Sequence, residues 1–193
     1  MSEEALLAQK LALRDQLVTA RRRRSLLEVA ESAQAIADHL LATTELQRAA
    51  TITAYVSMGG EPGTGPLLDT WFEAGRHTLL PVLLPDNDLD WARYTGSNLV
   101  AARRGLLEPD GERLGVDAIA RADVVVTPGL AVDRTGMRLG RGGGSFDRAI
   151  ARVPLGTPVI TLLYDDELLA MVPSGPLDRR VSAVVTPSGV TWF

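Results

Sequence analysis

The sequence predicts an α/β fold, organised as a single-domain three-layer α/β/α sandwich with a mostly parallel sheet. Short apolar runs typical of buried strands, such as residues 124–128 and 158–164, alternate with segments of helical periodicity. No repeat of fixed period and no low-complexity linker interrupts this alternation. The chain has 193 residues, which is enough for one substantial core, and its composition requires no second domain.

The overall composition narrows the classes of protein to which the chain can belong. Its formal net charge of −4 does not favour nucleic acid or an anionic membrane as the main partner. Without cysteine there is no disulfide framework, thiolate nucleophile or cysteine zinc site, and two histidines are too few for a histidine metal site. The first residues lack a signal-peptide pattern, and no apolar run approaches the roughly 18 residues of a membrane span. We expect a cytoplasmic protein with no membrane or nucleic-acid partner, and a monomer.

The first predicted helix covers residues 2–24. Glutamates occupy its first turn and arginines its last turn, as the helix dipole favours. At about 100° per residue, Lys10 and Arg14 fall within the apolar arc of this helix and not opposite it. Either both side chains extend past the apolar surface to water, or both meet one anion, because they lie four residues apart. The basic run at 21–24 is typical of a solvated face, with nucleic-acid contact as the alternative.

The remaining elements continue the alternation. Ser25 and Glu28 form a capping-box pattern at the start of a second helix. In order, we expect this helix to about residue 41, a strand over 51–57, a short helix over 66–75, strands over 78–84 and 89–95, a helical stretch over 116–121, a strand over 124–128, a helix over 146–153, a strand over 158–164, a helical turn or two over 165–171, and a last strand over 181–186.

Residues 138–148 form the principal candidate site. Four glycines within five positions leave backbone N–H groups open to a ligand and permit positive φ. The order of strand 124–128, loop and helix 146–153 suits a phosphate, and Arg138, Arg141 and Arg148 add guanidinium groups that match phosphate oxygens. The loop lacks the lysine of a Walker A motif and does not fit the dinucleotide fingerprint G-x-G-x-x-G. A glycine-rich turn with solvated arginines is the alternative.

Carboxylates extend this candidate site. Asp147 lies in the first turn of the helix expected after the loop, where it would repel a bound polyphosphate unless a divalent cation bridged the two. Mg2+ is therefore an expected cofactor. Glu61 lies in a flexible loop at the carboxyl end of a strand, the edge at which open α/β sheets bind ligands, although an isolated loop glutamate is more often solvated. Asp178, by itself, is an ordinary loop aspartate.

Four segments match the pattern of one known family. They are Lys10 and Arg14 as Lys-x-x-x-Arg, residues 55–58 followed by Glu61, the Gly-Leu-Leu-Glu-Pro segment at 105–109, and residues 127–133 followed by Gly136 and residues 138–148. The last segment is the most specific, since it looks like the signature Pro-Gly-Leu-Ala-Phe-Asp followed by Arg-Leu-Gly-x-Gly-x-Gly-Tyr-Tyr-Asp. Over nearly its whole length, the chain resembles the 5-formyltetrahydrofolate cyclo-ligase family.

The resemblance implies ATP-dependent cyclisation of 5-formyltetrahydrofolate to 5,10-methenyltetrahydrofolate, with release of ADP and phosphate. ATP and Mg2+ are the implied cofactors, and 5-formyltetrahydrofolate is the implied small-molecule partner. Asp147 and Asp178 would serve Mg2+, and Arg141 together with Asp147 would be catalytic. Val56 and Glu61 would contact the folate. The implied ATP-binding residues are Lys10, Arg14, Arg138, Leu139, Gly140, Arg141, Gly142, Gly143, Gly144, Ser145 and Phe146.

Three positions depart from the family pattern. Ser145 replaces one of two aromatic residues before the first aspartate, Leu177 replaces a histidine, and Ser182 stands where a polar or acidic residue is usual. They motivate one alternative, a catalytically impaired regulator that binds a nucleotide or folate. A sugar-phosphate isomerase-like enzyme is the second alternative; its glycine loop would hold the substrate's phosphate, and its turnover would not need ATP.

Overall fold

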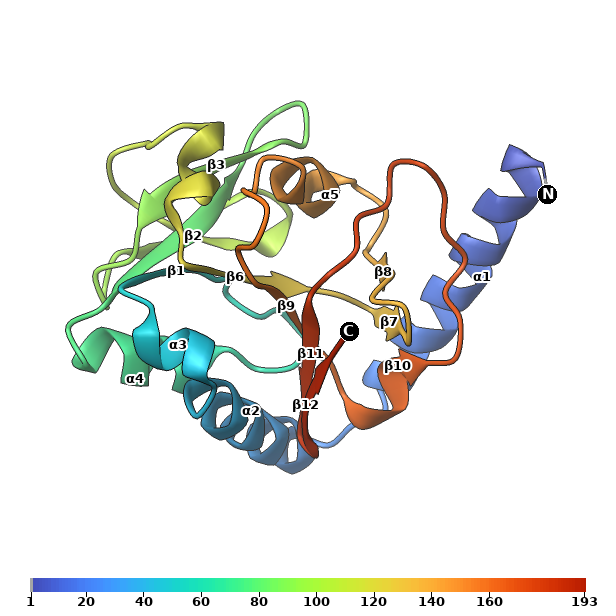
Figure 1. Ribbon diagram of the computed structural model, residues 1–193, viewed down its shortest axis with the longest axis horizontal. Helices are drawn as coiled ribbons and strands as arrows, with labels where there is room; N and C mark the ends of the chain where they lie inside the picture. Colours follow the sequence, from blue (N-terminus) through green and yellow to red (C-terminus); the bar gives the residue numbers. More distant parts are fainter. Residues whose placement is uncertain (1) are drawn as a thin grey trace.

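The computed structural model describes residues 2–193 and shows an α/β fold built on a seven-stranded sheet (Figure 1). Across this sheet the strands are β12 (Gly189–Trp192), β11 (Ala183–Thr186), β9 (Val159–Leu162), β6 (Val124–Pro128), β1 (Thr51–Thr53), β2 (His77–Leu83) and β3 (Leu89–Arg93). The inner strands β11, β9, β6, β1 and β2 are all parallel, and the edge strands β12 and β3 are antiparallel to their neighbours. The predicted mostly parallel sheet is confirmed.

Helices cover both faces of this sheet (Figure 1). On one face lie α2 (Leu26–Leu41), α3 (Thr44–Arg48) and α4 (Gly65–Glu73), and on the other lie the 3-10 helix η2 (Val116–Arg121) and α5 (Ser145–Ile150). Alternation along β6 divides its side chains between two cores, because Val124 and Val126 face α2 and α4 while Val125 faces α5. The α/β/α layering predicted from the sequence is therefore confirmed.

A smaller sheet beside the main one carries the N-terminal helix. This sheet has the order β10 (Leu168–Leu169), β7 (Ala131–Asp133) and β8 (Arg138–Leu139), and α1 (Glu3–Arg21) packs on it through Leu17. As a result, Arg14 reaches the backbone of Gly140, which lies 126 positions later in the chain. The remaining elements are β4 (Leu99–Ala101), β5 (Leu107–Pro109) and the 3-10 helices η1 (Arg103–Gly105) and η3 (Asp165–Glu167).

The capping box predicted at the start of α2 is confirmed. The Ser25 hydroxyl accepts from Glu28 N at 3.2 Å, and the Glu28 carboxylate accepts from Ser25 N at 2.7 Å, so the predicted capping box is present. This reciprocal pair satisfies two N–H donors that the start of α2 leaves without a partner inside the helix.

Several predicted boundaries were wrong, mainly where strands are very short. The strand expected over 51–57 ends at Thr53, and the helix expected to reach residue 153 ends at Ile150. Strands β7 and β8 lie between residues 124–128 and the glycine loop, so the loop does not directly follow β6. Strand β12 follows the strand expected to be last, and residues 165–171 form η3 and β10 instead of only helical turns. Elements of two to four residues are too short to show a period.

The basic run at the end of α1 is not uniformly solvated, which corrects the prediction for Arg21. Its side chain is 3% exposed and donates from Nε and Nη2 to the Glu167 carboxylate at 2.6 and 2.8 Å. Nη2 also donates to Gly129 O at 2.6 Å. Arg24 pairs with Asp166, and its guanidinium carbon lies 3.9 Å from the centre of the Tyr164 ring.

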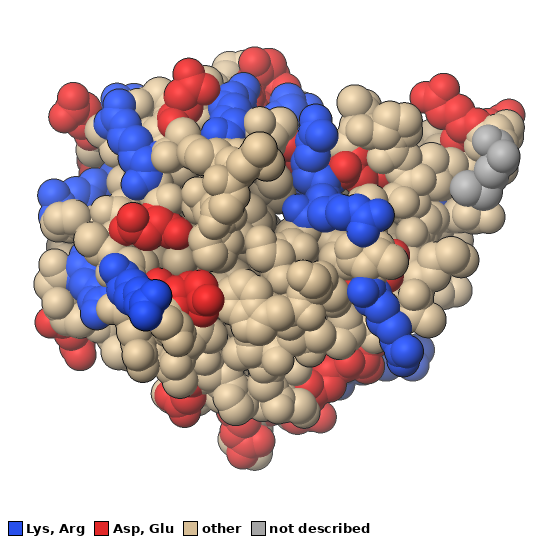
Figure 2. Space-filling model, in the orientation of Figure 1, with Lys and Arg blue, Asp and Glu red and all other residues tan. Residues whose placement is uncertain are grey.

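Acidic and basic side chains are interspersed on the face of the molecule shown in Figure 2. Within residues 2–193, no helix has both the length and the apolar character that crossing a bilayer requires.

Candidate functional site

A cavity of about 350 Å³ lies at the carboxyl ends of β1, β2 and β6. In parallel α/β sheets the loops at this edge form the ligand site. The cavity residues, contributed by segments far apart in the sequence, are Tyr55, Val56, Met58, Glu61, Pro81, Leu83, Leu89, Arg104, Leu106, Leu107, Glu108, Pro128, Gly129, Arg138 and residues 140–147. Most of the ATP-site residues expected from the sequence, together with both expected folate-contacting residues, therefore share one cavity.

The glycine loop, residues 140–144, contributes backbone donors to this cavity. The N–H groups of Arg141, Gly142, Gly143 and Gly144 donate to no other group in residues 2–193. Gly142 and Gly144 have φ of 101° and 68°, which favours glycine at both positions. Helix α5 has six residues, so its dipole is smaller than the predicted helix would supply, and the loop's own N–H groups are the main anion-binding feature.

Arg14 supports the glycine loop from the side of α1. Its Nε donates to Gly140 O at 2.9 Å, and a Cβ added at Gly142 would lie 3.3 Å from the Arg14 guanidinium carbon. The guanidinium therefore packs directly on the loop. The sequence left two interpretations of Lys10 and Arg14 open. The one in which the side chain extends past the apolar surface to water is wrong for Arg14.

Lys10 and Asp178 form an ion pair with each other. Asp178 also accepts a hydrogen bond from Gly175 N at 2.6 Å. Neither residue is among those that line the cavity described above. Within residues 2–193, no group of three or more His, Asp or Glu side chains is arranged to hold a metal ion. The assignment of Lys10 to ATP and of Asp178 to Mg2+ stays a prediction.

Arg138 fixes the position of Asp147. Its side chain is 2% exposed; Nη1 donates to Pro128 O at 2.9 Å and Nη2 to Asp147 Oδ1 at 2.8 Å. Within the described chain Asp147 Oδ2 has no protein partner. A carboxylate with one oxygen held by arginine and the other unbonded suits a metal ion that takes its remaining ligands from water and phosphate.

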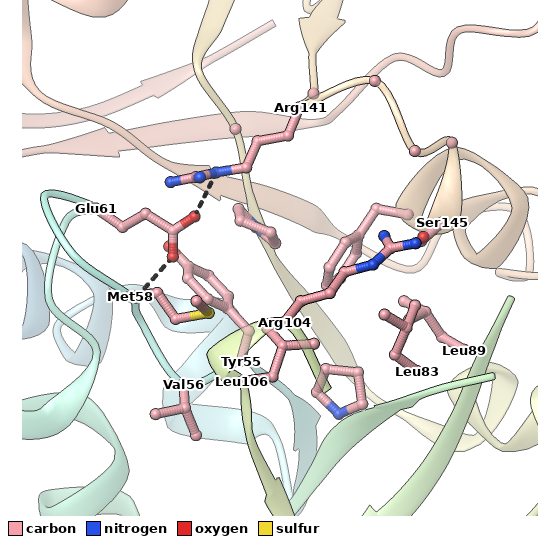
Figure 3. A pocket seen from close by; sticks show the side chains of 18 of the residues that line it. Tyr55, Val56, Met58, Glu61, Leu83, Leu89, Arg104, Leu106, Arg141 and Ser145 are labelled. Atoms are coloured by element: carbon pink, nitrogen blue, oxygen red, sulfur yellow. Dashed lines mark hydrogen bonds and ion pairs between the residues drawn. The ribbon is translucent and has the colours of Figure 1, made fainter. Parts of the chain in front are cut away.

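Glu61 and Arg141, expected to serve different ligands, are paired (Figure 3). Glu61 is 8% exposed; its Oε1 lies 3.0 Å from Arg141 Nε, and its Oε2 accepts from Met58 N at 2.9 Å. The Arg141 side chain is 55% exposed, so it can leave this pair more easily than the buried Glu61 can. Burial, and then the negative charge of Glu61, raise the pKa of Tyr55 well above its usual value, which keeps the phenol protonated.

Much of the cavity wall was missed by the sequence analysis. The apolar wall comprises Met58, Pro81, Leu83, Leu89, Leu106 and Leu107; Met58, Leu106 and Leu107 lie in segments matched to the family pattern but were given no role there. These residues come from four separate segments and show no common periodicity, so only the fold could group them. The sequence analysis also did not identify Arg104 as a cavity residue. Its backbone has a φ of 60°, and the only local sign of the site was the neighbouring Gly105, which begins a segment matched to the family pattern. Trp91 and Tyr94 belong to the two cores and do not line the cavity.

A second layer of contacts lies behind the cavity. The Arg21–Glu167 pair holds Gly129 O, and the Tyr164 hydroxyl donates to Gly60 O at 3.2 Å. Gly129 lines the cavity and Gly60 precedes Glu61, so this buried group connects the end of α1 with two cavity segments.

The sequence of this chain matches the family model described as the 5-formyltetrahydrofolate cyclo-ligase family over residues 7–187. The chain belongs to this family. A 5-formyltetrahydrofolate cyclo-ligase of Mycolicibacterium smegmatis is 44% identical over 142 residues, which cover 71% of this chain and 73% of that protein. One of Escherichia coli K12 is 34% identical over 164 residues, which cover 83% of this chain and 90% of that protein.

Solved structures agree with this membership at the level of the fold. The NMR structure of Aquifex aeolicus 5,10-methenyltetrahydrofolate synthetase superposes with a TM-score of 0.82 at 24% identity, covering 95% of this chain and 92% of that one. The synthetase of Mycoplasma pneumoniae superposes with a TM-score of 0.74 at 18% identity, covering 92% of this chain and 98% of that one. These two structures therefore share the fold of this chain.

Proposed function

We propose that this cyclo-ligase family member converts 5-formyltetrahydrofolate and ATP into 5,10-methenyltetrahydrofolate, ADP and phosphate. One cavity combines glycine-loop N–H groups that have no partner within residues 2–193, an apolar wall and a buried glutamate, and this combination is the observation that carries the proposal. N–H donors suit a polyphosphate, whereas an apolar wall with one fixed carboxylate suits a flat heterocycle that has N–H groups. Membership of the cyclo-ligase family supports ATP and a reduced folate as these two ligands.

The nucleotide would bind along the glycine loop. We assign the phosphates to the loop N–H groups and to Arg14, Arg141 and Lys10. Arg141 is the mobile charge of this set because it is half-exposed, whereas Arg138 is buried and committed to Asp147. Arg138 therefore positions Asp147. Leu139, Ser145 and Phe146 flank the glycine loop in sequence and are the remaining residues assigned to the nucleotide site.

Asp147 is the proposed carboxylate ligand of Mg2+, with Asp178 as the second. When bound, Mg2+ would neutralise phosphate charge during transfer of the γ-phosphoryl group. Asp147 fits this task because it lines the cavity and because one of its oxygens has no partner among residues 2–193. Asp178 would first have to leave Lys10.

The folate would bind against Val56 and the apolar wall, with Glu61 accepting hydrogen bonds from the pterin. The formyl oxygen attacks the γ-phosphorus of ATP, and the bond to the ADP oxygen breaks. N10 then attacks the formyl carbon and loses its proton, and phosphate leaves with the former formyl oxygen. Positioning and charge neutralisation supply most of the catalysis in phosphoryl transfer, so no cysteine or histidine nucleophile is needed.

The test is a coupled assay that follows methenyl absorbance and ADP release with MgATP and 5-formyltetrahydrofolate. Equal formation of both products is expected for the natural protein. Arg141→Ala should lower turnover about a hundredfold, the effect typical of losing one donor that stabilises developing charge. Arg134→Ala, a change at an exposed arginine outside the cavity, is the matched control and should leave the rate unchanged. Unchanged kinetics in Arg141→Ala would remove Arg141 from the mechanism.

One specific feature supports a second candidate, a regulator that binds these ligands without turnover. Ser145 lines the cavity where the family pattern has an aromatic ring, so one stacking surface for the substrate is missing. Tight nucleotide binding without formation of ADP or methenyl product would favour the regulator. ADP formation without methenyl product would instead point to another phosphoryl acceptor.

We further propose that the enzyme acts as a cytoplasmic monomer. All residues assigned a role above belong to a single chain, so the proposed chemistry requires no second subunit. Sedimentation at micromolar concentration tests the oligomeric state directly.

A further inference from the structure

Arg104 lines the cavity with a charge that no carboxylate of residues 2–193 neutralises. The two other arginines in the cavity wall are paired, Arg138 with Asp147 and Arg141 with Glu61. The Arg104 guanidinium instead donates from Nη2 to the neutral side-chain oxygen of Asn87 at 2.9 Å. It is therefore the cavity arginine most available to an anionic ligand.

The backbone at Arg104 is held in an unusual conformation. Arg104 and Asn87 have φ of 60° and 65°, and within the described chain they are the only residues other than glycine with positive φ. Their side chains are hydrogen-bonded to each other. Arg148 donates to Asn87 O at 2.6 Å and to Gly143 O at 3.1 Å, which connects this pair to the glycine loop. Strained backbone that is fixed by its surroundings is characteristic of ligand-binding positions.

The location of Arg104 indicates which part of a ligand it meets. It belongs to η1, and after Gly105 the chain continues into Leu106 and Leu107 of the apolar wall. Figure 3 shows its side chain extending from the Leu106 side of the cavity towards Ser145. A flat ligand body lying against the leucines would therefore have Arg104 at its margin. The exposed position of Arg104 also suits a group that leaves the cavity towards solvent.

We propose that Arg104 is a specificity-determining residue that binds a carboxylate of the substrate's glutamate tail. This inference rests on the proposed function, since a folate carries its anionic glutamate beyond the pterin and benzoyl rings. The ATP phosphates have other proposed partners, namely the glycine-loop N–H groups and Arg14, which contacts the loop from α1. A guanidinium and a carboxylate match in geometry, and a charged hydrogen bond of this kind changes affinity about tenfold or more.

The experiment compares two substrates at saturating MgATP: 5-formyltetrahydrofolate and 5-formyltetrahydropteroate, which lacks the glutamate. In Arg104→Ala we expect the KM for the glutamate-bearing substrate to rise about tenfold or more, while the KM for the pteroate changes less than twofold. Arg104→Lys should recover part of the difference because it keeps the charge. Arg103→Ala is the matched control, since Arg103 is exposed, bonds Leu83 O at 2.9 Å and does not line the cavity.

Several outcomes would overturn the proposal. A higher KM for MgATP with unchanged folate kinetics would assign Arg104 to phosphate. Equal losses with both folates would show that Arg104 acts through packing and not through the tail. If the natural protein forms no methenyl product, the proposed function is wrong, but the role of Arg104 can still be tested. Calorimetry then compares the affinities of the same two folates for the natural protein and for Arg104→Ala, and equal affinity losses for both folates would contradict a contact between Arg104 and the glutamate tail.

Discussion

Replacement of Glu167 by glutamine tests the buried ion pair that lies behind the cavity. Glu167 is 2% exposed and Arg21 is 3% exposed, and the carboxylate accepts two hydrogen bonds from the guanidinium and one from Tyr164 N at 2.9 Å. In Glu167→Gln, the guanidinium stays buried, loses its counter-charge and faces the N–H donors of the new amide. The variant therefore removes a charge without creating a cavity.

The expected loss is about 3–5 kcal/mol in the free energy of unfolding, because removing one partner leaves an uncompensated buried charge. For a chain of this size each kcal/mol corresponds to roughly 2–4 °C, so the melting temperature should fall by about 6–20 °C. Urea denaturation followed by circular dichroism measures the first quantity, and a thermal scan measures the second.

Asp166→Asn is the control, one position away. Asp166 pairs with Arg24, but its side chain is 63% exposed, and exposed pairs contribute about 1 kcal/mol or less. A loss below about 1 kcal/mol in Glu167→Gln, or equal losses in the two variants, would refute the view that burial makes the Arg21–Glu167 pair important.

Two further changes test pH dependence and the glycine loop. The Arg152 guanidinium, bonded to both carboxylate oxygens of Asp88 at 2.9 and 2.6 Å, holds the pKa of that carboxyl below its usual value. The stability that this pair contributes is present above about pH 4 and is lost as pH falls through the folded-state pKa. Asp88→Asn should therefore lower the free energy of unfolding at pH 7, and its free energy of unfolding, measured with urea, should change less between pH 5 and 2 than that of the natural protein. Gly142→Ala should raise the KM for MgATP about tenfold or more, since the new Cβ meets Arg14 at 3.3 Å with φ at 101°. Gly143→Ala, where the nearest atom is 3.6 Å away, should have a smaller effect; equal effects would contradict the steric argument.

Much of the fold was readable from local patterns. Residues 124–128 and 158–164 contain β6 and β9, and the Ser25–Glu28 signal marks the start of α2. These features depend on residues that are close together in the chain, so they can be recognised from the sequence alone. Strands β7, β8 and β10 depend on pairing between distant segments, and each has only two or three residues, so no local period announced them.

The candidate site also has one part that local sequence patterns revealed and another part that only the tertiary structure revealed. The glycine loop, Asp147 and Glu61 were identified from residue type and position, and Val56 only from the family resemblance; all of them line the cavity. The apolar wall was not identified, because ordinary leucines such as Leu83 and Leu89 carry no sign of a ligand until the fold groups them.

The sequence by itself determined the layered α/β class, the glycine loop and the family to which the chain belongs. Tertiary structure alone decided that Arg141 meets Glu61, that Lys10 meets Asp178 and that Arg21 is buried, unlike the other arginines of its run. The physical reason is the range of the interactions. Helix caps and glycine conformations are set within a few residues, whereas a charge acquires its partner only when the sheet order brings segments 80 to 168 positions apart into contact.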